Sequence, residues 1–211
     1  MRADADHILL SWFSPGYPVG AFAYSHGLER DIARGAVWNA DTLADWIDTV
    51  LAHGTGRADA IIMRAVLAGD PPEDMADLAL ALAASSERAM EVSALGAAFA
   101  RVTSAVWGTP DDPWPYPVAV AVAARALGLP EAALLRAYLH AMAANLVSVA
   151  VRFVPLGQTD GQRVLAGRFA LIDSVVSGTE FAVPDDILTA AFAADLAAME
   201  HETMDVRLYR S

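Results

Sequence analysis

A serine followed by a histidine stands near the N-terminus, in the pentapeptide AYSHG (residues 23–27). The pattern differs by one letter from G-x-S-x-G, the turn that presents the nucleophilic serine of many hydrolases between a strand and a helix. The preceding SPGYPVG is rich in turn residues and does not predict a strand. If the segment is helical, Ser25 and His26 also point about 100° apart. We therefore favour a structural or interface role for Ser25 and keep a helical-bundle hydrolase as the alternative.

Histidines and carboxylates offer a second kind of chemistry, metal binding. His26 and Glu29 are three residues apart and would share one face of a helix. Di-metal bundles use two Glu-x-x-His motifs and two further glutamates, whereas here the order is reversed and occurs once. Glu200, His201 and Glu202 are consecutive, so on a helix they fan out and cannot converge on one ion. We expect surface or capping polar groups; a metal enzyme using the AYSHG stretch, or a metal contact between molecules, stays an alternative.

Charge and composition exclude further classes of function. The sequence has 14 basic residues, all arginine, and 26 acidic ones, for a net charge of −12. An acidic surface repels phosphate backbones, so nucleic-acid binding is not expected. The absence of lysine removes the P-loop lysine and Schiff-base chemistry, which weakens any interpretation of the loop PLGQTDGQ (residues 155–162) as a phosphate cradle. Arginine forms forked pairs with carboxylates and suits protein interfaces.

The cellular setting is constrained by three absences in the sequence. No cysteine is present, which excludes disulfides and thiolate metal sites and fits a reducing cytoplasm. The first ten residues lack the basic region and apolar run of a signal peptide. The most apolar run, residues 137–151, is too short and too polar to span a bilayer and predicts a buried helix. We expect a cytoplasmic protein without a membrane segment.

Helical periodicity recurs along the whole chain, which is rich in the strong helix former alanine. The nearest strand candidate is VAVAVAA (residues 118–124), but its alanines and helical flanks favour a helix. We predict a single all-α domain over residues 1–211, a bundle of roughly eight to ten helices. The expected helices cover 41–53 with Asp41 as N-cap, 87–106, 118–127 ended by Gly128, Pro130 to Val151, a helix from a Thr159/Gln162 capping box through Val176, and a last one from Asp185 or Asp186 through Met199.

Aromatic residues crowd one short N-terminal segment that also holds glycines and prolines. Such a cluster favours a place in the core, although interfaces also favour aromatics. The cluster consists of Trp12, Phe13, Tyr17, Phe22 and Tyr24.

Three separated stretches resemble the urease accessory protein UreF family. SPGYPVGAFAYSHGLE (residues 14–29) is similar to the family's S-P-x-x-P-[IV]-G-x-[FY]-x-x-S-x-G-L-E opening. NLVSVAVRFVPLGQTDGQRVL (145–165) resembles its most recognisable internal block, and HETMDVRLYRS (201–211) its H-E-x-x-x-x-R-L-[FY]-x-S ending. SERAMEVSALG (86–96) adds a weaker match. The chain departs from the pattern at Ala23, where serine or threonine is frequent, and at Tyr209, where phenylalanine is usual.

The resemblance implies a non-enzymatic, all-α helper in urease maturation that needs no cofactor. Members of the family form homodimers, bind the accessory protein UreD (UreH in some systems) and recruit the nickel-carrying GTPase UreG. The complex delivers nickel to apo-urease with GTP hydrolysis, and a role in regulating that GTPase has been proposed. The partner-binding residues that the motifs imply are Tyr24, Ser25, Glu29, Gln158, Thr159, Asp160, His201, Glu202, Arg207, Leu208 and Tyr209.

The tail segment, residues 203–211, follows the last expected helix and is expected to be mobile when the protein is free. It would order against a partner, with Tyr209 as an aromatic anchor and Arg207 paired to a carboxylate. The alternative is that the tail packs on its own bundle. The loop Gly157–Gly161 is expected to support the dimer or to line a nickel passage.

Overall fold

The computed structural model describes the backbone of residues 2–211 and the side chains from Asp4 onward. Nine α-helices in this range have ten or more residues, and α2 and α9 are shorter. The expected all-α, single-chain bundle is confirmed, and no strand occurs within residues 2–211. In chain order the elements are α1 (Arg2–Trp12), η1 (Ala21–Ala23), α2 (Leu28–Ala33), α3 (Ala40–His53), α4 (Thr55–Ala68), α5 (Pro72–Ala81), α6 (Ser86–Trp107), α7 (Tyr116–Leu127), α8 (Glu131–Phe153), α9 (Gln158–Ala166), α10 (Phe169–Gly178), η2 (Pro184–Asp186) and α11 (Phe192–His201).

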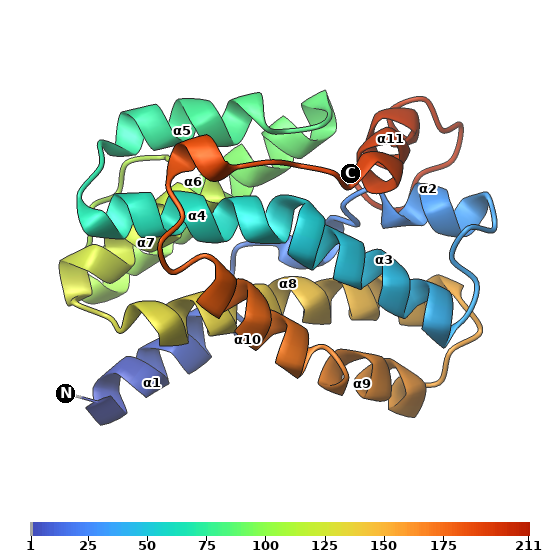
Figure 1. Ribbon diagram of the computed structural model, residues 1–211, viewed down its shortest axis with the longest axis horizontal. Coiled ribbons are helices and arrows are strands. Elements are labelled where there is room, and N and C mark those ends of the chain that lie inside the picture. The colour runs from blue at the N-terminus through green and yellow to red at the C-terminus, as the bar shows by residue number, and fades with distance from the viewer. Residues whose placement is uncertain (1) are drawn as a thin grey trace.

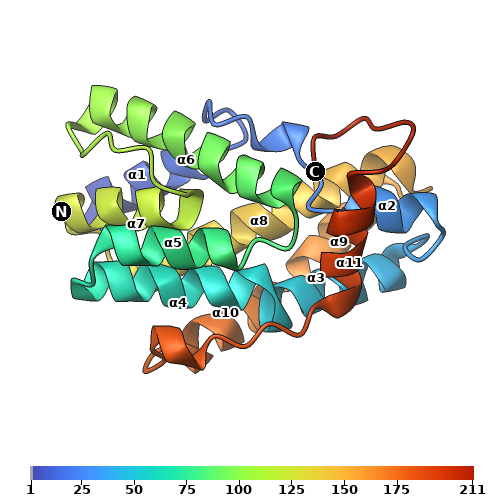
Figure 2. The same ribbon diagram turned by 90° about the horizontal axis from the view of Figure 1, so that it is seen from above.

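The long helix α8 runs through the middle of the bundle (Figure 1), and α1, α2, α3, α4, α9 and α10 all pack against it. Seen from above, α4, α5 and α6 lie roughly parallel to one another (Figure 2), and α7 packs against all three. The run Val118–Ala124 is buried on every side because it forms the middle of α7. A helix that is apolar on every face belongs in a core. The apolar letters of this run therefore reflect the burial of a helix and not a strand.

One helix, α8, is long and apolar enough to cross a membrane by length and composition alone. Half of its most apolar window is buried inside the bundle. Leu134, Leu139 and Leu146 on this helix are almost fully buried. These contacts agree with the buried helix expected over residues 137–151.

Several predicted helix boundaries are wrong. The N-cap of α3 is Asn39 and not Asp41: the Asn39 side chain accepts from the Thr42 N–H at 2.8 Å, and Thr42 completes a reciprocal capping box. Thr159 and Gln162 form no such box, because α9 already begins at Gln158 and its N-cap, Gly157, has no side chain. The helix expected to continue through Val176 is interrupted at Gly167–Arg168 and resumes as α10.

The last helix also starts later than predicted. Residues 184–186 form the short 3₁₀ turn η2, and α11 begins only at Phe192. The intervening chain crosses the α3–α4 junction (Figure 1), where the Ala190 N–H donates to the His53 carbonyl at 2.7 Å. Ala191 is buried against Gly54, where a Cβ would lie 2.8 Å from the Ala191 methyl. This long-range contact prevents residues 187–191 from forming a helix. The local hydrophobic periodicity gives no sign of the contact.

Gly96 permits the closest crossing in the core. A Cβ at this position in α6 would lie 1.9 Å from the Trp114 carbonyl oxygen and 2.8 Å from Pro115. We expect Gly96→Ala to lower the free energy of unfolding by about 3 kcal/mol, because backbone atoms cannot move aside as a flexible side chain can. Urea denaturation measures the change. Gly178→Ala is the control, since nothing lies within 4 Å of its Cβ position; equal stability of both variants would contradict the prediction.

Candidate functional site: a buried polar seat for the tail segment

Four parts of the chain meet at one end of the bundle, where the C-terminus lies beside α11 and α2 (Figures 1 and 2). They are residues 23–29, the start of α6, the end of α8, and α11 with the tail segment. We call the first three, together with His201, the tail seat. The buried polar residues here are Ser25, Glu29, Glu87, Arg88, Glu91, His201 and Ser211.

Glu29 on α2 is the centre of the tail seat. Its side chain is 7% exposed, and its two oxygens accept hydrogen bonds from two successive tail amides, those of Leu208 at 2.9 Å and Tyr209 at 3.0 Å. The Nε2 atom of His201 lies 3.1 Å from Oε2 of the same carboxylate. Burying an ionised carboxylate is unfavourable unless donors replace water, and these three groups do so.

His201 at the end of α11 bridges two carboxylates and is completely buried. Its Nδ1 atom is 2.6 Å from Oε2 of Glu87, and its Nε2 atom faces Glu29. An ionised carboxylate can only accept a hydrogen bond. Both contacts are therefore hydrogen bonds at the same time only when Nδ1 and Nε2 of His201 each carry a proton. The expectation that His201 is a surface or capping residue is therefore wrong. Only tertiary packing brings carboxylates from α2 and α6 to a histidine on α11.

Metal binding is not favoured by this arrangement. The two carboxylates contact opposite nitrogens of one ring, so they do not converge on a single point. Within the side chains that the structure describes, no group of three or more histidines or carboxylates is placed to hold a metal ion. Glu202, adjacent in sequence, instead accepts from the Ser86 hydroxyl at 2.6 Å and from the Glu87 N–H at 3.1 Å. These hydrogen bonds lower the pKa of Glu202 and cap the start of α6.

Ser25 lies at the bottom of the tail seat. Its hydroxyl is fully buried and donates to the Ser211 carbonyl, and its N–H donates to the same oxygen at 2.8 Å. The His26 ring turns away to Thr55, with Nε2 3.1 Å from the threonine hydroxyl. A serine buried beneath the chain's own backbone and turned away from the neighbouring histidine lacks the geometry of an activated nucleophile.

Tyr209 fills the aromatic part of the tail seat. It is 7% exposed, its ring lies 5.7 Å from that of Phe153, and its hydroxyl accepts from Arg152 at 3.2 Å. Phenylalanine, usual here in the resembling family, would lack this hydroxyl contact. Arg207 pairs with Glu87, which is the chain's own carboxylate and not a partner's. The predicted mobility of residues 203–211 stays a prediction, and the contacts described are those of the seated tail.

The N-terminal aromatics divide between core and surface. Trp12, Tyr17 and Tyr24 are buried, Phe13 is partly buried, and Phe22 is 68% exposed. The Tyr24 carbonyl accepts from the Asn145 side chain at 3.1 Å, which ties the first motif to α8.

The predicted loop residues lie apart from the tail seat. Gln158 and Thr159 are exposed at the start of α9, and Asp160 pairs with Arg163 at 2.6 Å. Gly161 packs against α8, where a Cβ would lie 2.7 Å from Val151. This packing accounts for one glycine of PLGQTDGQ without any ligand.

Sequence reasoning missed four charged residues of the tail seat. Glu87, Arg88 and Glu91 belong to an otherwise alanine-rich helix, and Arg152 lies in the last turn of α8. Glu87 and Glu91 are four residues apart and share one helix face, a signal that was present in SERAMEVSALG. The periodicity alone does not show that this face is buried.

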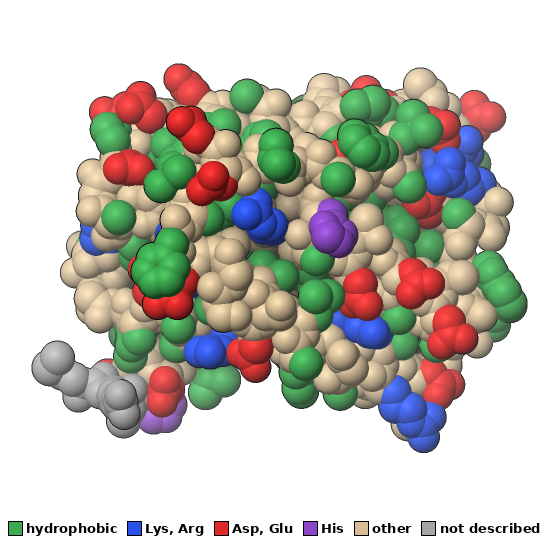
Figure 3. Space-filling model, in the orientation of Figure 1, with side chains coloured by type: hydrophobic (Ala, Val, Ile, Leu, Met, Phe, Trp, Pro, Cys, Tyr) green, Lys and Arg blue, Asp and Glu red, His purple; other side chains and the backbone are tan. Residues whose placement is uncertain are grey.

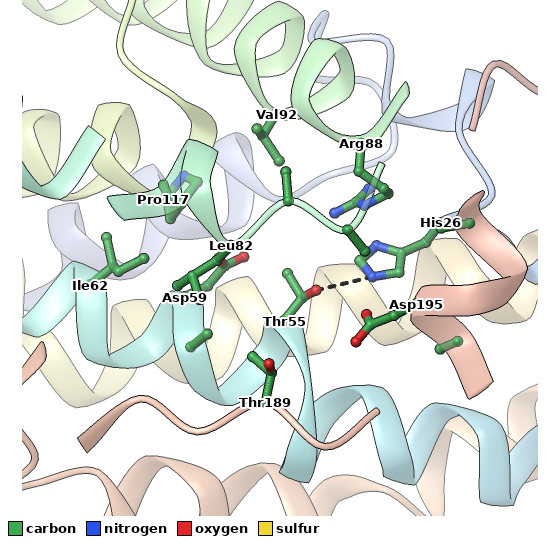
Figure 4. Close-up of a pocket in the computed structure, with 16 residues that line it drawn as sticks. His26, Thr55, Asp59, Ile62, Leu82, Arg88, Val92, Pro117, Thr189 and Asp195 are labelled. Carbon is green, nitrogen blue, oxygen red and sulfur yellow. Dashed lines mark hydrogen bonds between the residues drawn. The ribbon is translucent and has the colours of Figure 1, made fainter. Parts of the chain in front are cut away.

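Two small cavities adjoin the tail seat and share His26, Asp59 and Arg88 in their walls. Their volumes, ≈ 30 and ≈ 90 Å³, give room for water molecules. Figure 4 shows the smaller one, with His26 pointing to Thr55 and Arg88 reaching in from α6. Burial, followed by the Arg88 charge, holds the pKa of His26 well below its ordinary value. Burial raises the pKa of Asp59 to about 7, against the opposing effect of the Tyr138 hydroxyl, which donates to it at 2.6 Å.

Fold and site together define an all-α protein whose buried polar residues around Ser25 hold the chain's own C-terminal segment. Comparison with known proteins gives the family. The model of the UreF family matches residues 37–168. The chain is 52% identical over 203 residues to the urease accessory protein UreF of Cereibacter sphaeroides strain KD131, covering 96% of this chain and 97% of that protein. The corresponding protein of Roseobacter denitrificans is 48% identical over 100% of this chain and 96% of its own length.

A third relative, the urease accessory protein UreF of Rhodopseudomonas palustris strain BisA53, is 41% identical and covers 99% of this chain and 94% of its own length. The chain belongs to the UreF family of urease accessory proteins. The family model does not include residues 14–29 or 201–211, but the matches to these relatives extend over nearly the full length.

Asp59 gives a test of the cavity electrostatics. Its pKa is 3.8 when unfolded and about 7 when folded, so between these values the native state keeps a proton that the unfolded state has lost. The resulting stability is present below pH 4 and is lost as pH rises through 7, by a total of about 4 kcal/mol. Asp59→Asn cannot ionise, so it should gain stability relative to wild type as pH rises from about 5 to about 8.

Urea denaturation at the two pH values measures this difference. Tyr138→Phe removes the hydroxyl that donates to the ionised carboxylate and should make the loss of stability on raising the pH larger than in wild type. Parallel pH profiles for wild type and Asp59→Asn would show that Asp59 does not keep its proton in the folded protein.

Proposed function

We propose that this chain acts as a cytoplasmic, non-enzymatic adaptor in urease maturation. It bridges UreD (UreH) and the GTPase UreG, so that nickel, the cargo of the complex, reaches apo-urease. The observation that carries the proposal is the similarity to UreF proteins over nearly the whole chain. The meeting of the first and last family motifs in one buried site supports it further.

The rival function, a hydrolase or metal enzyme using Ser25 and His26, has less support. Ser25 is covered by Ser211, and the His26 ring is bonded to Thr55. We therefore propose that Ser25, Glu29 and His201 hold the tail and serve partner binding through it. Tyr24 and Glu202 are proposed to support the same surface by fixing the neighbouring segments to α8 and α6.

The surface proposed to bind the accessory partners surrounds the tail seat. Phe192, Leu196 and Met199 lie at spacing i, i+4, i+7 on α11 and are 75%, 48% and 49% exposed. Leu208 on the tail is 71% exposed. Figure 3 shows hydrophobic side chains gathered where α11 lies. An exposed apolar helix stripe of this kind marks a protein interface.

A second apolar surface suits the proposed homodimer. A groove of ≈ 860 Å³ lies between α1, α8 and α10, lined by Leu9, Leu10, Phe13 and Phe169 among others. Its rim carries the Arg136–Asp173 ion pair, so both charge signs are available for pairing with a second copy. A two-fold interface uses one patch on both subunits, and this groove offers apolar and charged groups together. Gln158, Thr159 and Asp160 remain proposed to support the dimer or to line a nickel passage.

Reconstitution tests the proposed function. Apo-urease, UreD, UreG, nickel and GTP should give strong urease activity only when this protein is added, and the protein alone should show no turnover. Phe192→Asp should lower both UreD capture and activation, because it places a charge on the apolar stripe of α11.

Phe181→Asp is the matched control, since Phe181 is 89% exposed but lies before η2 and outside α11. Activation that is independent of the protein would refute the adaptor function. An equal loss from both phenylalanine variants would refute the assignment of the α11 surface.

The homodimer is tested separately by size-exclusion chromatography with light scattering. Leu10→Arg should yield monomers, because it introduces a charge into the apolar groove. Leu188→Arg should stay dimeric, although Leu188 is exposed to a similar degree, 79% against 71%. A dimeric Leu10→Arg protein would move the interface away from this groove.

A further inference from the structure

Each of the last five residues, 207–211, makes a hydrogen bond to the tail seat. Their partners come from α2, α6 and α8, more than 50 residues away in sequence. We propose that the tail seat is a peptide-binding site that recognises the pattern Arg-x-Tyr-x-Ser, and that the chain's own residues 207–211 are a separable ligand for it. The inference rests on the seat geometry and not on the proposed role in urease maturation.

Backbone contacts provide the part of the recognition that does not depend on sequence. The Arg210 N–H donates to the Ala23 carbonyl at 2.9 Å, and the Ser25 N–H donates to the Ser211 carbonyl at 2.8 Å. These two bonds tie the backbone of the tail to residues 23–25. Glu29 receives the amides of Leu208 and Tyr209.

Side-chain contacts to the seat are made by every second residue of the tail, at positions 207, 209 and 211. Arg207 pairs with Glu87, Tyr209 packs on Phe153 and bonds Arg152, and Ser211 donates to Glu91. Leu208 and Arg210 are exposed, and the side chain of Arg207 is 41% exposed despite its ion pair. The seat therefore offers three contacts of different chemistry, acidic, aromatic and hydroxyl-accepting, to positions one, three and five of the peptide.

The carboxylates of the seat are positioned by helices that precede the tail segment. Glu29, Glu87 and Glu91 are fixed on α2 and α6, and His201 on α11 bridges the first two. Gly27 lets α11 approach closely, since a Cβ there would lie 2.7 Å from the Ala198 nitrogen. The linking residues Asp205 and Val206 are exposed and lie outside the helices. A vacated seat would leave buried carboxylates with fewer donors, which favours rebinding of the same pattern.

The test uses full-length protein and a fluorescent octapeptide with the sequence of residues 204–211. In the double variant Arg207→Ala/Tyr209→Ala the chain's own tail competes poorly. The peptide should therefore bind it saturably in anisotropy titrations, and about tenfold or more tighter than it binds wild type, whose tethered tail has a high effective concentration. Peptides with alanine in place of Arg207 or Tyr209 should bind about tenfold weaker, and one with alanine in place of Leu208 should bind normally.

Equal peptide binding by wild type and the double variant, or equal losses from the Leu208 and Tyr209 peptides, would overturn the proposal. If the double variant does not fold, a wild-type chain with a protease site inserted between Asp205 and Val206 replaces it. Cut after folding, it should retain the released hexapeptide and exchange it for the fluorescent one. Loss of the hexapeptide without rebinding would show that the tail is not a separable ligand.

Discussion

The structure depends at its functional end on one buried carboxylate, that of Glu29. Its oxygens are shared between two tail amides and the ring of His201. A carboxylate removed from water is tolerated only when donors surround it, and here the donors come from parts of the chain more than 170 residues away in sequence. The N-terminal motif, α11 and the tail are therefore held together because the buried Glu29 carboxylate needs hydrogen-bond donors from both α11 and the tail. Neither Glu29 nor the tail has its full set of partners without the other.

The rest of the bundle provides a rigid support for this arrangement. Small residues allow close approach of helices, as at Gly96 against the segment before α7 and at Gly27 against α11. Arg64 on α4 bonds the Val176 carbonyl at 2.7 Å and also pairs with Glu131, which ties α10 and α8 to α4. The apolar groove of α1, α8 and α10 and the exposed stripe of α11 belong to different helices. The proposed dimer contact and the proposed partner contact therefore use different residues.

The sequence predicted the helices well where local signals decide them. Gly128 ends α7 with a positive φ, and α8 follows Pro130, as expected. Prediction failed where contacts between distant segments prevail. Residues 187–191 stay out of helix because they cross the α3–α4 junction, although Asp185 and Asp186 resemble a helix start. The first and last family motifs were identified by resemblance, but no local sequence signal indicated that they contact each other.

The sequence by itself determined an all-α chain, its family, and the motifs that resemble that family, because periodicity, capping and motif letters are local properties. Tertiary structure alone decided that His201 is buried between Glu29 and Glu87, that Ser25 is covered by Ser211, and that Glu91 belongs to the site at all. The physical reason is that the burial of a charge depends on which distant groups surround it. The sequence around a helical glutamate does not show whether its side chain is exposed to solvent or buried. Only the packing of distant segments decides this.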